Sequence, residues 1–140
     1  MKPEKNIKKT STYFRPNILE SEVIGFIQKN LGGEREVYFS YGLADLVINQ
    51  TIIEAKKWDN WKELLGQMLV HKFVNPDRPI RGVIFCRDRT FPPYNKSFVE
   101  TIFENFGFKI WVVTDEFIRK RLSSRTKKDP KRSSMALPEV

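Results

Sequence analysis

The sequence contains one cysteine, one histidine and no hydrophobic run long enough to cross a membrane. Because Cys86 is single, it excludes an intramolecular disulfide and a zinc-finger ligand set, and a reducing compartment is expected. The single His71 excludes most histidine-dependent chemistry, including Ser-His triads, so carboxylates must carry any hydrolysis. Residues 1–9 have no apolar core of a signal peptide. We expect a protein without a membrane span, soluble and intracellular, in the cytoplasm or wherever its DNA lies.

Acidic residues are too few to balance the basic ones, and the formal net charge is +8. The excess lies at the ends: residues 1–15 carry a net charge of +4, residues 119–140 carry +6, and residues 16–118 carry −2. Basic ends around a near-neutral body favour binding to a phosphate backbone without reading its sequence. We predict a flexible basic arm (1–15), one folded domain (16–122) and a disordered basic tail (123–140).

A predicted β-hairpin over residues 44–56 carries the charges of most interest, with a turn at the pair Asn49-Gln50. A two-residue turn places Asp45 directly opposite Glu54, and side-chain alternation puts Lys56 on the same face as Glu54. Opposed carboxylates destabilise a strand pair unless a cation joins them. Mg²⁺, which binds one or two protein carboxylates and several waters, suits this position. We predict a Mg²⁺ or Mn²⁺ site, with the lysine positioning the attacking water.

An aspartate, a short hairpin and then Glu-x-Lys resemble the signature of the PD-(D/E)XK nucleases, which include restriction enzymes, Holliday-junction resolvases and phage and homing endonucleases. The resemblance covers residues 17–114. It implies that Asp45 and Glu54 bind metal and that Lys56 is the motif lysine. Ala44 stands where the motif has a proline, which the superfamily often replaces. Cutting both strands of DNA requires two sites, so a homodimer is expected.

Two helices flank the hairpin and supply further candidates. The resemblance implies that a glutamate of the first helix joins the metal site; Glu20 is the better match and Glu22 the fallback. Glu20 also fits a capping box with Asn17, which is the alternative role for it. The resemblance implies that Gln67, on the second helix, lines the site, as a glutamine there does in the resembled nucleases. A position on the flank of the helix without a functional role is equally consistent. His71 is expected to be a satisfied surface or C-terminal residue rather than a ligand.

The predicted fold class is α/β, with a restriction-endonuclease-like core. A mixed central sheet of about four strands, including the antiparallel hairpin, is flanked by helices and contains a parallel crossover. Asn60 with Glu63 and, later, Asp115 are predicted helix caps. The predicted order is helix, three strands, helix, strand, helix, strand, helix. Besides the two strands of the hairpin, the predicted strands are 35–41, 81–86 and 108–114, and the predicted helices are 17–31, 60–73, 95–106 and 115–122.

Basic residues after a strand end and in the C-terminal segment are candidate DNA contacts. They are Arg87, Arg89, Arg119, Lys120, Arg121, Lys127 and Lys128. Solvated surface charge is the alternative for the first two. We therefore expect a Mg²⁺-dependent DNA endonuclease, either structure-selective like the junction resolvases or of the nicking or homing type. The alternative is a non-catalytic, basic nucleic-acid-binding protein, in which the hairpin charges form a surface ion cluster.

Overall fold

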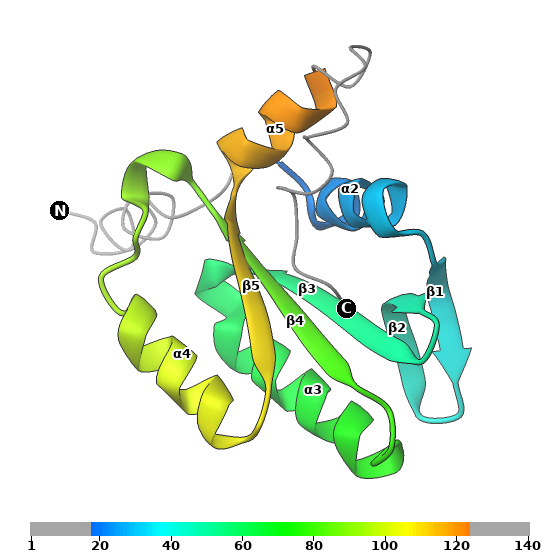
Figure 1. Ribbon diagram of the computed structural model, residues 1–140. Helices are drawn as coiled ribbons and strands as arrows, with labels where there is room; N and C mark the ends of the chain where they lie inside the picture. Colours follow the sequence, from blue (N-terminus) through cyan, green and yellow to red (C-terminus); the bar gives the residue numbers. More distant parts are fainter. Residues whose placement is uncertain (1–17, 124–140) are drawn as a thin grey trace, which may run out of the picture.

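The computed structural model describes residues 18–123, which form alternating helices and strands (Figure 1). The elements are α2 (Glu20–Leu31), β1 (Glu34–Phe39), β2 (Gly42–Ile48), β3 (Thr51–Lys57), the 3-10 turn η1 (Trp58–Asn60), α3 (Trp61–Val74), β4 (Ile80–Cys86), the 3-10 turn η2 (Asp88–Thr90), α4 (Lys96–Asn105), β5 (Lys109–Thr114) and α5 (Asp115–Ser123). The predicted order of helices and strands is confirmed. The basic arm and nearly all of the tail lie outside the described residues.

The strands form one five-stranded sheet in the order β1-β2-β3-β4-β5. β1, β2 and β3 pair antiparallel, whereas β3, β4 and β5 pair parallel through the crossover helices α3 and α4. The prediction of a mixed sheet with an antiparallel hairpin is confirmed. The estimate of about four strands was one too low, because β1 adds an outer strand along β2. The restriction-endonuclease-like core stays a prediction.

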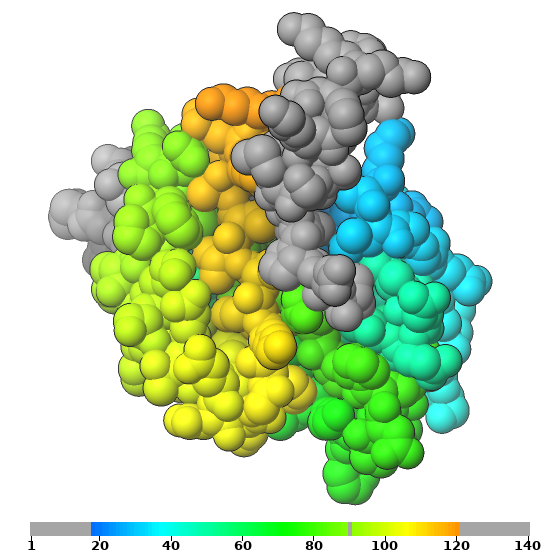
Figure 2. All heavy atoms as spheres, viewed as in Figure 1, coloured from blue at the N-terminus to red at the C-terminus, as the bar shows by residue number. Residues whose placement is uncertain are grey.

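The helices cover both faces of the sheet, in three layers. On one face, α2 and α5 pack on a core that includes Phe26, Ile53 and Trp111. On the other, α3 and α4 pack on a core that includes Met68 and Phe103. In the space-filling view, α4 lies at one side of the molecule and α2 with the β1–β2 hairpin at the other (Figure 2). None of the helices within residues 18–123 is long and apolar enough to span a bilayer.

Two predicted caps are wrong. Asn60 precedes α3, but its side chain makes no capping hydrogen bond, because its backbone belongs to the turn η1 rather than to an extended segment. At α5 the Thr114 Oγ1 accepts a hydrogen bond of 3.2 Å from the Phe117 N–H, so Thr114 takes the capping role expected of Asp115. α5 is held on α2 by an edge-to-face contact between Phe26 and Phe117, whose ring centroids are 6.1 Å apart.

Gly82, in the centre of β4, is expected to tolerate no side chain. A Cβ there would lie 2.7 Å from Met68 Sδ and 3.2 Å from Leu64 Cδ2, both on α3. We expect Gly82→Ala to lower the free energy of unfolding by about 1–3 kcal/mol, because overpacking forces neighbouring side chains from their rotamers. In the matched control, Gly66→Ala, the new Cβ on α3 meets nothing within 4 Å, and about 1 kcal/mol of stabilisation is expected. Equal urea midpoints for the two variants would contradict this packing.

Candidate active site

The β2–β3 hairpin has the predicted two-residue turn. Its register pairs Leu46 with Ile53, Val47 with Ile52 and Ile48 with Thr51. Asn49, the first turn residue, has a positive φ of 56°, a conformation that tight hairpin turns need and asparagine tolerates. The hairpin therefore carries Asp45 and Glu54 to neighbouring positions next to the last ladder pair.

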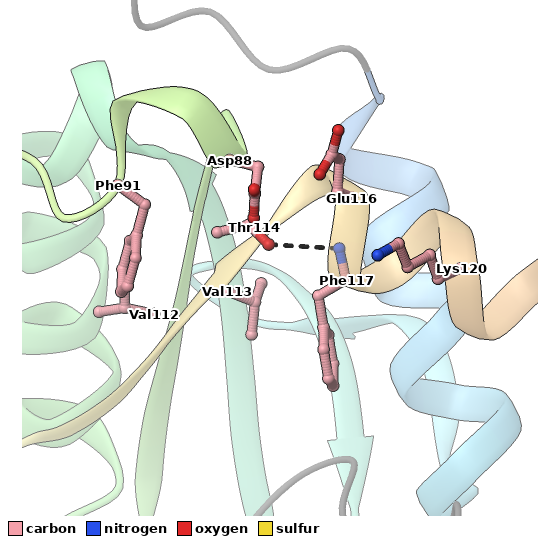
Figure 3. Close-up of a pocket in the computed structure, with 8 residues that line it drawn as sticks. All are labelled: Asp88, Phe91, Val112, Val113, Thr114, Glu116, Phe117 and Lys120. Atoms are coloured by element: carbon pink, nitrogen blue, oxygen red, sulfur yellow. Dashed lines mark hydrogen bonds between the residues drawn. The ribbon is translucent and has the colours of Figure 1, made fainter.

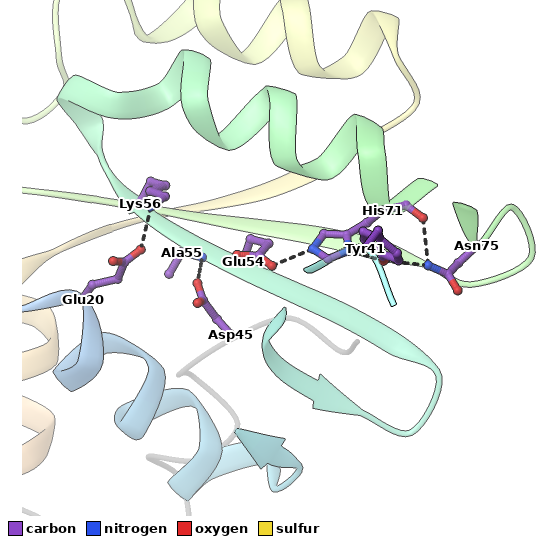
Figure 4. A network of polar contacts seen from close by, with 8 residues as sticks. All are labelled: Glu20, Tyr41, Asp45, Glu54, Ala55, Lys56, His71 and Asn75. Carbon is purple, nitrogen blue, oxygen red and sulfur yellow. Dashed lines mark hydrogen bonds and ion pairs between the residues drawn. The ribbon is translucent and has the colours of Figure 1, made fainter. Parts of the chain in front are cut away.

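Asp45 does not complete a regular cross-strand pair with Glu54, which corrects the expected geometry. Instead, its Oδ2 accepts a hydrogen bond of 3.0 Å from the Ala55 backbone N–H, so the carboxylate takes the place of a backbone carbonyl of β2 in the pairing with β3. The two acids still interact, because the charge of Asp45 contributes to raising the pKa of Glu54. Figure 4 places Asp45 between Glu20 and Glu54. The predicted convergence of the acids is therefore present, although Asp45 is held by the backbone.

Glu54 is the most deeply buried acid of this cluster, with 3% of its surface exposed. Burial above all, with the nearby Asp45 in addition, raises the pKa of Glu54 to about 7 against the lowering effect of a hydrogen bond with His71. The Glu54 Oε2 lies 2.6 Å from the His71 Nε2. The raised pKa of Glu54 favours its protonated form, which relieves the repulsion between the two acids, and the other partner of Glu54 is a histidine that the sequence analysis did not place here.

His71 is buried, with 3% of its surface exposed, so the expected surface position is wrong, whereas the expected position near the C-terminal end of the helix is confirmed, because His71 lies in the last turn of α3. Its Nδ1 lies 2.5 Å from the Tyr41 hydroxyl, which accepts a hydrogen bond of 2.9 Å from the Asn75 side-chain amide. A signal in the sequence could have found it. His71 follows Leu64 and Met68 at the i, i+4, i+7 spacing of one helix face, and these three are the buried residues of α3.

Glu20 and Lys56 meet at the start of α2. The Lys56 Nζ lies 3.6 Å from Glu20 Oε2 and 3.9 Å from Glu63 Oε2. Burial raises the pKa of Glu20; Lys56 opposes this rise, and Asp45 adds to it.

The capping role predicted for Glu20 is wrong, because α2 begins at Glu20 itself. Glu22 is the capping acid, and its Oε1 accepts a hydrogen bond of 2.7 Å from the Leu19 N–H. Asn17, the predicted N-cap, lies outside the described residues. Of the two candidate glutamates, Glu20 is therefore the one that faces the hairpin acids.

Two hollows adjoin this cluster, and each is lined by a residue with a buried side-chain oxygen that accepts no hydrogen bond within the described residues. These oxygens are Glu20 Oε2, which is ion-paired with Lys56 at 3.6 Å, and Gln67 Oε1. The hollow of about 510 Å³ is lined by Ile18, Leu19, Glu20, Lys56, Lys57, Asn60 and Phe85. The hollow of about 470 Å³ is lined by Tyr41, Gly42, Leu43, Glu63, Gly66, Gln67, Val70 and His71. Lys56 of the first lining and Glu63 of the second form an ion pair of 3.9 Å, so the linings of the two hollows meet at this contact.

The donor set fits a hard divalent cation. Within residues 18–123, no group of three or more His, Cys, Asp or Glu side chains is close enough to hold a metal ion by itself. Mg²⁺ needs only one or two protein carboxylates, because waters and substrate phosphate complete its shell. Asp45 and Glu54 can supply these, and Glu20, whose charge interacts with that of Asp45 and whose Oε2 is ion-paired with Lys56, is a third carboxylate nearby. Mn²⁺ takes the same oxygen donors.

The candidate DNA-contacting arginines lie at one edge of the sheet. Arg87 and Arg89 directly follow β4. Because β3 and β4 are parallel and Lys57 pairs with Phe85, this end of β4 lies at the same edge as Lys56. Phosphate contacts by Arg87 and Arg89 stay predictions, supported by this shared edge.

The basic residues of the C-terminal segment are only partly described. Arg119 and Lys120 are exposed on α5, while the side chain of Arg121 and all of Lys127 and Lys128 lie outside the description. Lys120 also lines a third hollow, of about 500 Å³, beside Phe91 and Phe117 (Figure 3). Asp88 and Glu116 line the same hollow, and their carboxylates oppose an anionic ligand there.

The chain is similar to parts of two KilA-N domain-containing proteins of Acanthamoeba polyphaga mimivirus. It is 39% identical to one over 71 residues, which are 51% of this chain and 19% of that protein. It is 36% identical to the other over 59 residues, which are 42% of this chain and 24% of that protein. The matches thus span about a fifth to a quarter of these relatives. No family model and no solved structure matches the chain.

Proposed function

We propose that this protein binds DNA and cleaves it as a metal-dependent endonuclease. The observation that carries the proposal is the meeting of Glu20, Asp45, Glu54 and Lys56 from α2, β2 and β3. Asp45 raises the pKa of both neighbouring acids, so the cluster concentrates negative charge in a partly buried position. Such a cluster lowers the stability of the fold. Carboxylates with shifted pKa values beside a hollow are typical of functional sites.

The residues of the cluster take distinct roles in this proposal. Asp45 and Glu54 hold Mg²⁺, and Glu20 assists through water. Mg²⁺ held there would supply charge stabilisation to the transition state. Lys56, released from its contacts with Glu20 and Glu63, orients the attacking water and offsets charge that develops on the phosphate. The water oxygen bonds to phosphorus as the bond to O3′ breaks; the water gives one proton to solvent, and the O3′ oxygen takes one up from solvent. Gln67 steadies the phosphate or the water from the adjoining hollow.

A second candidate is a non-catalytic DNA-binding protein. Two observations favour it: one oxygen of Glu54 is already bound by His71, and both relatives are named for a KilA-N domain, a family with DNA-binding function. The comparison with the relatives therefore supports DNA binding more directly than cleavage. In this case the charged side chains of the hairpin stabilise the fold, and the basic ends alone bind the phosphate backbone.

Cleavage assays separate the two candidates. Supercoiled, linear, nicked, flapped and four-way DNA are each incubated with Mg²⁺, Mn²⁺ or EDTA. The endonuclease yields products that require the metal and prefer one DNA shape, whereas the binding protein yields none under any condition. Double-strand cuts accompanied by dimers in sedimentation would support the homodimer, and single nicks by a monomer would contradict it.

We expect DNA binding to depend steeply on salt under either candidate. If the basic ends contact six or more phosphates, affinity falls by about 10³-fold or more between 50 and 200 mM salt. A chain ending at Ser123 keeps every described helix and strand but loses five basic residues of the tail, so its salt dependence should be clearly weaker. Fluorescence anisotropy with a labelled duplex in EDTA measures both. Identical slopes for the two chains would show that the tail does not contact DNA.

A further inference from the structure

A buried row of hydrogen bonds runs from Asn75 through Tyr41 and His71 to Glu54 (Figure 4). We infer that His71 is a positioning residue: Tyr41 fixes its tautomer, and it holds one oxygen of Glu54 so that the other stays turned towards Asp45 and a cation. The inference rests on the proposed metal site and assigns to it a residue outside the carboxylates and the lysine.

The direction of the row follows from Asn75. The atom that faces the His71 carbonyl, at 3.1 Å, must be the amide nitrogen, because a carbonyl oxygen only accepts. The same nitrogen donates to the Tyr41 hydroxyl oxygen at 2.9 Å. The Tyr41 hydroxyl has two hydrogen-bond partners within the described residues, and since Asn75 donates, His71 Nδ1 is the one that can accept the tyrosine hydrogen. The orientation of one amide thus sets the direction of the whole row.

The tautomer of His71 follows in the next step. An imidazole nitrogen that accepts from Tyr41 carries no hydrogen, so in the neutral ring the hydrogen lies on Nε2. The Nε2–H then donates to Glu54 Oε2 over 2.6 Å. Such an arrangement is the usual way in which an outer partner fixes the orientation of a metal-binding group.

Packing holds the row in one geometry. The Tyr41 ring stacks on Phe39, with centroids 5.6 Å apart and planes at 21°, and meets the edge of His71 at 5.4 Å. His71 and Glu54 are each only 3% exposed, so water cannot readily replace either partner. The Glu54 carboxylate is therefore preorganised before any cation arrives, which lowers the entropy lost when the cation binds.

Tyr41→Phe tests the inference with little change in packing, because the ring remains and only the hydroxyl is lost. Tyr38→Phe, at an 81% exposed position of the neighbouring strand β1, is the matched control. The chain has a single histidine, so ring ¹⁵N NMR reports on His71 alone. We expect the Nε2–H tautomer in the wild type and the control, and a tautomer mixture in Tyr41→Phe. Mn²⁺ titration calorimetry should show about 10-fold weaker binding for Tyr41→Phe.

His71→Leu removes the donor to Glu54, and we expect it to weaken Mn²⁺ binding by about 10- to 100-fold, with partial recovery in His71→Gln. A dominant Nδ1–H tautomer in the wild type would overturn the inference, as would unchanged tautomer and Mn²⁺ affinity in Tyr41→Phe. A purely structural histidine would lower the melting temperature of these variants without changing the tautomer or the affinity. Wild-type protein that binds no Mn²⁺ would instead overturn the proposed metal site, and the NMR result would still decide the tautomer and the hydrogen-bond row.

Discussion

Asp45→Asn is expected to reduce Mg²⁺-dependent DNA cleavage by about 10³-fold or more. Loss of the central carboxylate removes a metal ligand, and metal stabilisation of the transition state contributes several kcal/mol, each 1.4 kcal/mol being tenfold in rate. The asparagine keeps a side-chain oxygen, so it can still accept the hydrogen bond from the Ala55 N–H that joins the strands. Single-turnover cleavage of the preferred DNA substrate at saturating protein measures the rate without interference from weakened DNA binding.

The matched control is Asp77→Asn, which makes the same change of charge at an exposed position in the turn before β4. It should cleave at the wild-type rate. Mn²⁺ titration of both variants adds a readout independent of cleavage, with heat lost only in Asp45→Asn. Equal cleavage rates for wild type and Asp45→Asn would remove the metal site and leave the non-catalytic DNA-binding function as the better description.

Glu54→Gln is expected to abolish a large pH dependence of stability in EDTA. The pKa of Glu54 rises from 4.5 in the unfolded chain to about 7 in the fold, so the folded state retains a proton that the unfolded state releases. Stability from this group is full below about pH 4.5 and is lost as the pH rises through 7. The loss amounts to about 3 kcal/mol, since each pKa unit corresponds to about 1.4 kcal/mol.

Urea unfolding of wild type and Glu54→Gln between pH 4 and 8 measures this loss as a difference, in which other titrating groups cancel. The glutamine oxygen still accepts from His71 Nε2, which preserves the buried contact. Saturating Mg²⁺ should restore part of the wild-type stability at pH 8, because a cation that binds only the folded protein stabilises it. A parallel pH dependence in the two proteins would mean that Glu54 has the same pKa in the folded and the unfolded chain, and would remove the electrostatic argument for a cation.

The sequence predicts the order of elements and the hairpin correctly because these depend on local signals. Asn49-Gln50 between two aliphatic runs specifies the turn, and the turn specifies the register that carries Asp45 and Glu54 together. The parallel strand β4 is recognisable as a buried aliphatic run between a proline-containing turn and a loop. Local propensity and side-chain alternation are sufficient for these features.

The site's surroundings were harder to predict because they depend on how helices rotate against the sheet. The apolar residues of α3 predict a buried stripe through Trp61, Leu64, Leu65, Met68 and Leu69, but the buried face runs through Leu64, Met68 and His71. This rotation of about one residue brings the histidine onto Glu54, a contact between residues 17 positions apart in the chain. Likewise, the role of Glu22 as the cap depends on where α2 begins, and the capping pattern placed the N-cap at Asn17, two residues before the observed N-cap Leu19.

The packing of α5 on α2 has a consequence for how DNA reaches the cluster. Because Phe117 anchors α5 beside Phe26, the exposed basic residues Arg119 and Lys120 of α5 lie on the helix that packs on α2, which carries Glu20. Under the proposed function, DNA bound by α5 would be tethered to the same molecule as the acidic cluster, and a short tether raises the local concentration of the second contact to the millimolar range. The basic residues of α5 and the acidic cluster would then bind one DNA molecule at two points, and each weak contact would strengthen the other.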